Sequence, residues 1–242
     1  MCYNMPMPTL SIVIPTKNEE EFLPRLLRSI KLQSVQPLEV IVADAGSTDA
    51  TEKIAKQYDA KIVEGGMPGP GRNRGAEAAE GDLIFFFDAD VELLDKDFLK
   101  NAIKGFEFKK FDVATVDVMP LDGNKYDVFS HHVYNRYVRL LGTRHAHAPG
   151  FCLLARRAFH GKIGGFDEAV VFCEDSDYAQ RACKQGRFGW LSDINIHVST
   201  RRQERDGRLS MGVKYIFAEL HMIFIGPIRH HKFNYTFGHS KK

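Results

Sequence analysis

The 242-residue sequence predicts an α/β protein. Short β-branched runs alternate with segments of helical period, which is the pattern of βαβ units with right-handed crossovers. In addition, residues 83–87 form a run of five large apolar residues that ends in Asp88-Ala89-Asp90. Such a run is typical of a strand buried on both faces of a helix-covered parallel sheet.

Composition places the chain among ordinary globular proteins, since 44% of the residues are hydrophobic and 26% are charged. The length fits one large α/β domain or two small ones, and the expectation is a single domain over residues 1–242. The net charge of +2 gives no overall field for nucleic acid, and we expect no nucleic-acid partner. Residues 201–242 hold nine Lys or Arg against three Asp or Glu. This basic end is either a solvated tail or a contact for phosphates or an anionic membrane surface.

Three further observations favour a cytoplasmic protein. The four cysteines, which include Cys2, show no Cys-x-x-Cys spacing, so reduced thiols are expected. No basic segment followed by an apolar run stands at the N-terminus. No stretch reaches the ~18–20 apolar residues that a spanning helix needs.

The first elements follow one another at short spacing. A β-branched run at residues 9–14 predicts a strand that Pro15 stops, and Asn18 is the expected cap of a helix that ends near residue 30. A strand at residues 38–43, a turn at 44–49, a helix over about 50–58 and a short strand at 61–63 complete a βαβαβ unit.

A Gly/Pro loop at residues 65–71 precedes an alanine-rich helix that is expected to begin at Arg72. The loop lacks the Lys-Ser/Thr of a P-loop, and its glycines miss the dinucleotide fingerprint by one residue. What remains is a helix start whose N–H groups and Arg72 guanidinium suit a phosphate.

Asp88 and Asp90 end the buried strand. Ligands of open α/β sheets bind beyond the carboxyl ends of the strands, and carboxylate oxygens suit Mg²⁺ or Mn²⁺. The pair is therefore a candidate metal and phosphate site. The alternative is a structural pair that caps a helix or a turn.

The second part of the chain predicts helices at residues 97–108, 126–141 and 174–184, and strands at 113–119 and 151–155. Residues 126–141 have the period of an amphipathic helix. Residues 213–225 are apolar around most of a helix and are followed by the basic residues 229–232. Three docking partners stay open for this helix: the sheet, a partner subunit or a membrane.

Six segments together resemble family 2 glycosyltransferases of the GT-A fold. Four resemble the donor-site motifs of that family: residues 11–19, 44–49, 72–75 with 81–82, and 88–90. Two resemble its acceptor-side segment: residues 164–168 and 174–178. The resemblance implies one mixed, mostly parallel sheet, with a donor half over residues 9–95, an acceptor half over 96–205 and a C-terminal helix and basic tail over 206–242.

The resemblance also implies a reaction and its participants. A sugar would pass with inversion from a UDP- or GDP-linked donor to a hydroxyl of a saccharide or lipid-linked acceptor, with Mn²⁺ or Mg²⁺ as cofactor. A homo-oligomer and a peripheral membrane contact through the basic end are both compatible with it.

The residue roles follow from matched motif positions. Pro15, Thr16 and Glu19 would line the base and ribose, Asp44 would hydrogen-bond the nucleobase, and Arg72 would approach the base or the diphosphate. Asp88 would face the ribose and the metal. Asp90 would ligate the metal, with His197 as a further ligand or diphosphate contact. Asp175 matches the general base. Ala45 stands where the family commonly has a second Asp, which leaves the nucleobase open.

Several alternatives stay open on the residues alone. Asp175 could be a helix-start acid, His197 a structural strand histidine, and Arg201-Arg202 a phosphate clamp or a charged turn. The chain could also be a non-catalytic nucleotide-sugar-binding module. A phosphatase of the haloacid dehalogenase type would share the run ending in Asp88 and Asp90, but that strand would lie at the start of its domain.

Overall fold

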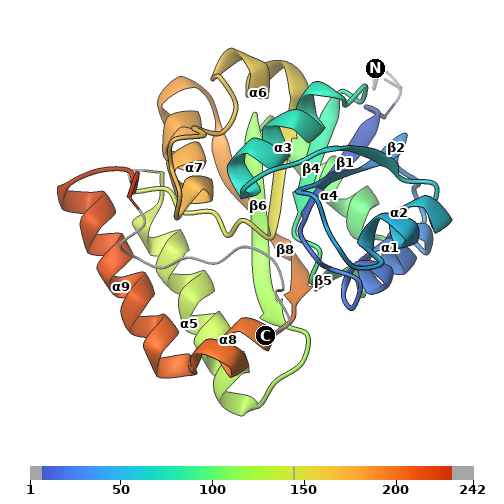
Figure 1. Cartoon of the computed structure of the whole chain (residues 1–242). Coiled ribbons are helices and arrows are strands. Elements are labelled where there is room, and N and C mark those ends of the chain that lie inside the picture. Colours follow the sequence, from blue (N-terminus) through green and yellow to red (C-terminus); the bar gives the residue numbers. More distant parts are fainter. Residues whose placement is uncertain (1–6, 144, 231–242) are drawn as a thin grey trace.

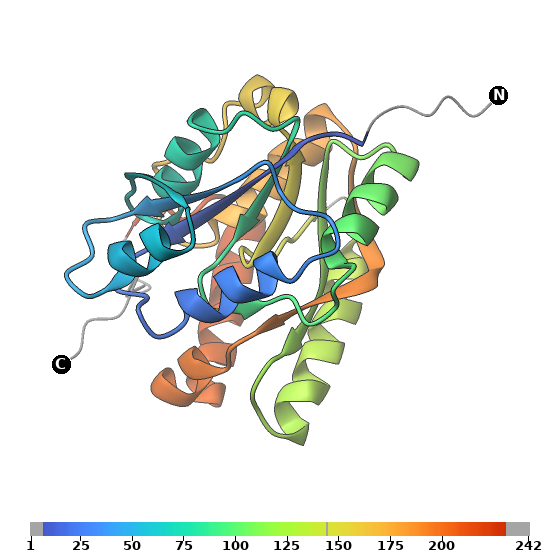
Figure 2. The same cartoon turned by 90° about the vertical axis from the view of Figure 1, so that its right-hand side faces the viewer.

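The structure is a computed structural model that describes residues 7–143 and 145–230. Figures 1 and 2 show a central sheet with helices on both of its faces. Cys2 and the basic positions from 231 onward, which enter the sequence-based expectations, lie outside the described residues.

The described strands form one mixed sheet in the order β3-β2-β1-β4-β7-β6-β8-β5. The strands are β1 (Leu10–Thr16), β2 (Glu39–Asp44), β3 (Lys61–Glu64), β4 (Leu83–Phe87), β5 (Val91–Glu92), β6 (Val113–Pro120), β7 (Cys152–Arg156) and β8 (Phe188–Val198). Strands β1 to β4 are parallel to one another, β6 is parallel to β8, β7 runs antiparallel between β4 and β6, and β5 is antiparallel to β8. The α/β class and the mixed, mostly parallel sheet are confirmed.

The helices are α1 (Leu23–Lys31), α2 (Thr51–Gln57), α3 (Pro68–Glu77), α4 (Phe98–Phe108), α5 (Lys125–Leu141), α6 (Arg157–Lys162), α7 (Glu174–Gln185), α8 (Arg201–Asp206) and α9 (Arg208–Phe224). Helices α1, α2 and α4 contribute to the core on one face of the sheet, while α3, α6 and α7 contribute to the core on the other. Helices α5 and α9 lie toward one end of the molecule (Figure 1).

The run of apolar residues in β4 is buried on both faces, as expected. Phe85 and Phe87 belong to one core, where their rings stack at 4.7 Å, and Phe86 belongs to the other core. All three side chains are fully buried. Asp88 and Asp90 therefore follow a strand that is buried along its whole length.

Two local expectations are wrong. Helix α3 begins at Pro68 rather than at Arg72, because proline suits the first turn of a helix and the Gly/Pro segment is helical rather than a loop. Asn18 does not cap α1: it has a positive φ of 54°, and its Oδ1 atom accepts a hydrogen bond from the Thr48 backbone instead. Strand β5, only two residues long, was not expected from the sequence.

Helix α5 is amphipathic, but its polar face is turned toward the protein and its apolar face toward the outside. Three of its four buried residues are polar, namely Asp127, His131 and Asn135, and the fourth is Val138, whereas most of its large apolar side chains are exposed. The Asn135 side chain makes two hydrogen bonds with the backbone of Val118 in β6. Polar contacts thus hold the inner face of α5 against the sheet.

Helix α9 is also poorly covered. Of its residues only Ala218 and Met222 are buried, in a small cluster with Phe172 and Ile228. No described helix has the length and apolar character needed to cross a bilayer.

Candidate functional site

Strands β1, β2 and β4 end at one edge of the sheet, and most of the site residues expected from the sequence lie there. Pro15 and Thr16 end β1, Asp44 ends β2, and Asp88 follows β4. Thr16 pairs in register with Asp44. Arg72 of α3 joins Asp88 to Glu174 at the start of α7, and Arg201 at the start of α8 binds Asp90.

Arg72 is the centre of the first ion cluster, which we call the Arg72 centre. Its guanidinium is almost fully buried and donates to Glu174 at 2.7 Å, to Asp88 at 2.7 Å and to the Gly150 carbonyl at 3.0 Å. It also lies over the Phe166 ring, at 5.4 Å. Arg72 therefore links the end of β4 to the start of α7, and its terminal nitrogens are engaged by protein groups.

Asp175 borders the Arg72 centre. A Cβ atom on Gly150 would lie 2.9 Å from both Arg72 Nη2 and Asp175 Oδ2, so only glycine fits between these two side chains. Burial, followed by the charge of Glu174, raises the pKa of Asp175 to about 7, although Arg72 acts in the opposite direction. A carboxyl with this pKa can exchange a proton near neutral pH.

A chain of hydrogen bonds connects Asp175 to α9. The backbone N–H of Ser176 donates to Asp175 Oδ1 at 2.7 Å. The Ser176 hydroxyl is 3.1 Å from His147 Nδ1, and His147 Nε2 is 2.8 Å from Glu219. His147 thus helps to seat the first turn of α7, a role that its His-x-His spacing in the sequence does not suggest.

Arg201 is the centre of a second cluster, the Arg201 centre. It donates from Nε to Asp90 Oδ2 at 2.7 Å and from its two terminal nitrogens to Glu19 at 2.8 and 3.0 Å. Its guanidinium carbon lies 4.1 Å from the centre of the Phe22 ring. Burial is the main cause that raises the pKa of Glu19 to about 7, against the lowering effect of Arg201.

The Arg201 centre is suited to a divalent cation. Asp90 is buried, and its Oδ1 atom has no hydrogen-bond partner among the described residues. Mg²⁺ and similar ions are commonly held by one or two carboxylates together with substrate phosphates, so a complete protein cage is not required. Indeed, no three His, Cys, Asp or Glu side chains of the described residues gather as a metal cluster.

His197 lies on β8, in register with Glu92 of β5. Its Nδ1 atom is buried and has no hydrogen-bond partner within the described part of the chain, and burial lowers its pKa. A neutral imidazole with a free nitrogen has the chemistry of a metal ligand. Its role as a ligand beside Asp90 stays a prediction.

The expected nucleotide end is a tight polar turn. Asp44 accepts hydrogen bonds from the Thr16 hydroxyl at 2.8 Å, the Ser47 hydroxyl at 2.6 Å and the Ser47 backbone at 2.7 Å. Pro15 packs against Gly71 of α3, where a Cβ atom would come within 3.2 Å of the proline ring. These contacts within the protein fix the ends of β1 and β2 without the help of a ligand.

Asn73 joins the two halves of the site. Its side chain accepts from the Phe166 backbone N–H at 2.8 Å and donates to the Phe166 carbonyl at 2.9 Å. A Cβ atom on Gly165, whose φ is +64°, would lie 2.5 Å from Asn73 Oδ1. Phe166 in turn stacks on Tyr178 of α7 at 4.3 Å. Helix α3 and the segment that leads into α7 are therefore held together by specific contacts.

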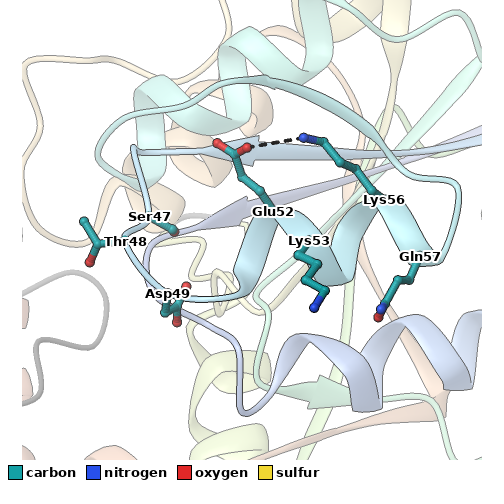
Figure 3. A pocket seen from close by; sticks show the side chains of 7 residues that line it. All are labelled: Ser47, Thr48, Asp49, Glu52, Lys53, Lys56 and Gln57. Carbon is teal, nitrogen blue, oxygen red and sulfur yellow. Dashed lines mark ion pairs between the residues drawn. The ribbon is translucent and has the colours of Figure 1, made fainter.

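Figure 3 shows a shallow groove on the outer side of α2, lined by Ser47, Thr48, Asp49, Glu52, Lys53, Lys56 and Gln57. Ser47, Thr48 and Asp49 belong to the turn at residues 44–49 of the expected donor site, whereas the other four lining residues lie on α2 and were not expected in the site. The Glu52–Lys56 ion pair on the α2 side is solvent-exposed, at 3.7 Å. We interpret the α2 side of the groove as a solvated helix face.

Sequence reasoning had not assigned Glu174, Gly150 or His147 to the site. For Arg201 it left two interpretations open, a phosphate clamp or part of a charged turn. Arg72 and Glu174 are 102 positions apart, and Arg201 and Asp90 are 111 apart. The only local signals were the acidic start of α7 and the basic pair after His197. The partner of each charge is a property of the folded chain.

Comparison with known proteins gives relatives in both sequence and structure. The chain is 27% identical over 209 residues to the poly(ribitol-phosphate) β-N-acetylglucosaminyltransferase TarS of Staphylococcus aureus, an alignment that covers 81% of this chain and 36% of that protein. The chain thus spans about a third of the length of this relative.

Two solved structures share the fold. A crystal structure of S. aureus TarS residues 1–349 in complex with UDP-GlcNAc has a TM-score of 0.63 at 24% identity, with 79% of this chain and 58% of that chain covered. The mannosyltransferase PcManGT from Pyrobaculum calidifontis, in complex with GDP-Man and Mn²⁺, has a TM-score of 0.68 at 21% identity, with 89% and 65% covered. The GT-A fold expected from the motifs is confirmed.

The family of the chain follows from a match to a family model that covers more than half of its residues. The family model described as glycosyl transferase family 2 matches residues 11–164, which span β1 to the end of α6 and contain the donor-side motifs. The chain therefore belongs to glycosyl transferase family 2.

Proposed function

We propose that this protein is an inverting glycosyltransferase that moves a sugar from a UDP- or GDP-linked donor to a hydroxyl group of its acceptor. The observation that carries the proposal is the position of Asp175. This carboxyl group has a raised pKa and borders the Arg72 centre, to which Asp88 from the donor side belongs. Family membership and the nucleotide-sugar complexes of the structural neighbours support the same reaction.

Each group of residues has a separate task in this mechanism. The ordered turn of Thr16, Asp44 and Ser47 receives the base and ribose, while Asp88 and Asp90 lie toward the diphosphate. Asp175 takes the proton of the acceptor hydroxyl as the new bond forms, and a positioned base of this kind contributes about 10²- to 10⁴-fold. Arg72 and Ser176 hold this carboxylate in place.

A divalent cation fits the proposal, with Asp90 as its first ligand and His197 as the second candidate. When bound, it would stabilise the negative charge of the leaving diphosphate. Because Arg201 pairs with Asp90 Oδ2 while Oδ1 remains open, Asp90 can hold the arginine on one oxygen and offer the other. The Mn²⁺ in the PcManGT complex supports this assignment.

A ligand panel tests the donor site directly. The melting temperature of the purified chain is measured with UDP, GDP, ADP and UDP- and GDP-sugars, each with Mn²⁺, with Mg²⁺ and with EDTA. We expect stabilisation by a uridine or guanosine diphosphate that requires the metal, as ligand binding to the folded state raises its stability. Absence of any metal-dependent shift across the panel would refute the donor site.

A further inference from the structure

The outer face of α9 is apolar without interruption. Residues spaced by three or four positions lie on one side of a helix, and here that side is opposite to the buried Ala218. The exposed side chains on it are Leu209, Val213, Ile216, Phe217, Leu220 and Phe224. Their exposed fractions run from 44% to 82%, and no charged residue interrupts them. A soluble surface rarely leaves such a stripe uncovered.

Helix α5 continues this apolar surface. Its outer stripe consists of Tyr126, Phe129, Val133, Tyr137 and Leu140, all exposed. The Tyr137 hydroxyl, at one edge of this stripe, donates to Glu219 of α9 at 3.2 Å, so the two helices are neighbours. We call the two apolar stripes together the α5–α9 surface. Figure 1 shows the two helices side by side.

A row of basic residues borders this surface. Lys125, His132, Arg136 and Arg139 are exposed on α5 and share one side of the helix, next to the apolar stripe and away from α9. Arg139 forms an ion pair with Asp117 of β6, so the cations of this row that have no carboxylate partner in the described residues are Lys125 and Arg136. The carboxylates of both helices lie elsewhere: Asp127 is buried on the inner face of α5, and Glu219 lies between the helices. An apolar face with a basic edge is the pattern of a helix that lies in the interface of an anionic membrane.

We propose that the α5–α9 surface docks on an anionic lipid bilayer, with the apolar stripes among the acyl chains and the basic row at the headgroups. The same surface of a second copy would supply no carboxylate for the basic row, so charge complementarity favours lipid over a dimer. His147, which lies within hydrogen-bond distance of Ser176 beside Asp175, also contacts Glu219 of α9, so direct contacts link this surface to the candidate base.

Vesicle sedimentation with the full chain tests this surface without reference to the reaction. One variant combines Phe129→Glu with Ile216→Glu, one substitution on each apolar stripe. A second combines Lys125→Glu with Arg136→Glu, for which the described residues include no ion-pair partner. The control pair, Lys104→Glu with Phe108→Glu, changes a lysine and a phenylalanine on α4 that are also exposed but lie away from the surface.

We expect the unchanged protein to sediment with phosphatidylcholine vesicles that contain phosphatidylglycerol and to stay largely in solution with phosphatidylcholine alone. The apolar pair and the basic pair should each weaken binding by at least about tenfold, since each basic residue near an anionic surface contributes severalfold. The control pair should bind like the unchanged protein. Circular dichroism checks that each variant is folded.

Two outcomes would overturn the proposal. One is binding that shows no preference for phosphatidylglycerol or that survives both variant pairs. The other is a dimer in sedimentation velocity that the apolar pair dissociates while vesicle binding is unchanged, which would assign the surface to a second copy. Because no nucleotide sugar is present, neither outcome bears on the proposed transferase reaction.

Discussion

The two arginine centres are built alike and differ in what they leave open. In each, a guanidinium joins two carboxylates and lies over a phenylalanine ring: Arg72 over Phe166, and Arg201 over Phe22. The side chain of Arg72 is 2% exposed and that of Arg201 is 12% exposed. At the Arg201 centre, one oxygen of Asp90 has no partner in the described residues.

This difference suggests a division of labour. The Arg72 centre ties α3, β4 and α7 together, and its atom without a partner in the described residues is the Arg72 Nε, a donor that cannot bind a cation, so we interpret this centre as the support that positions Asp175. The Arg201 centre keeps an open carboxylate oxygen beside a guanidinium, so it is the place where a cation can be accommodated. Three substitutions distinguish a closed support from an open ligand site.

The largest expected effect is on the reaction and concerns the residue beside the Arg72 centre. Asp175→Asn should lower the rate at which nucleoside diphosphate is released from the nucleotide sugar that the enzyme uses, by about 10²- to 10⁴-fold. The reason is that the asparagine amide cannot accept the proton of the acceptor hydroxyl. Donor binding, measured by thermal shift, should persist. Asp177→Asn, in the same first turn of α7 but paired with Arg181, serves as a control. Unchanged turnover in Asp175→Asn would remove this residue from the base role.

Removing each arginine tests the two centres against one another. Arg72→Ala leaves buried carboxylates unpaired and should cost about 3–5 kcal/mol, or roughly 10 °C in melting temperature. Arg201→Ala likewise leaves two buried carboxylates, those of Asp90 and Glu19, without their cation and should cost a similar amount, and Mn²⁺ should restore part of it because the metal can replace the guanidinium at Asp90. Mn²⁺ should not rescue Arg72→Ala.

Arg205→Ala is the matched control for Arg201, since it removes a neighbouring arginine of α8 whose ion pair with Asp206 is exposed. Its effect should stay below about 1 kcal/mol. Calorimetric scans with and without Mn²⁺ measure all three variants. Equal rescue of Arg72→Ala and Arg201→Ala by Mn²⁺ would contradict the distinction between the centres.

The smallest effect is a pH dependence at the Arg201 centre. The pKa of Glu19 is raised from 4.5 to about 7, so between these values the folded protein holds a proton that the unfolded chain has released. Stability should therefore fall as the pH rises from about 4.5 to about 7, by at most about 3 kcal/mol from this group. Glu19→Gln should flatten that part of the profile, as measured by urea unfolding.

The exposed carboxyl of Glu77 provides the control, because Glu77→Gln should leave the profile unchanged. Asp175 also has a raised pKa and contributes in the same direction. The double variant Glu19→Gln with Asp175→Asn should therefore be flatter than either single variant. A Glu19→Gln profile as steep as that of the unchanged protein would show that Glu19 is ionised in the folded state.

The sequence alone determined the order of the first strands and the edge at which their polar residues meet. The apolar run of β4 is a local signal, and parallel strands bring their carboxyl ends to one edge whatever the remaining chain does. Thr16, Asp44 and Asp88 could be placed together for this reason. The motifs were sufficient for the family and for the GT-A fold, which the comparisons confirm.

Only the tertiary structure decided the partners of the charges and the direction of the amphipathic faces. Arg72 and Arg201 contact carboxylates about a hundred positions away, and no local propensity encodes a pairing over that distance. The period of residues 126–141 predicts an apolar stripe but not which way it faces. In α5 the hydrogen bonds of Asn135 to β6 turn the polar face inward, and that contact exists only once β6 and α5 are packed together.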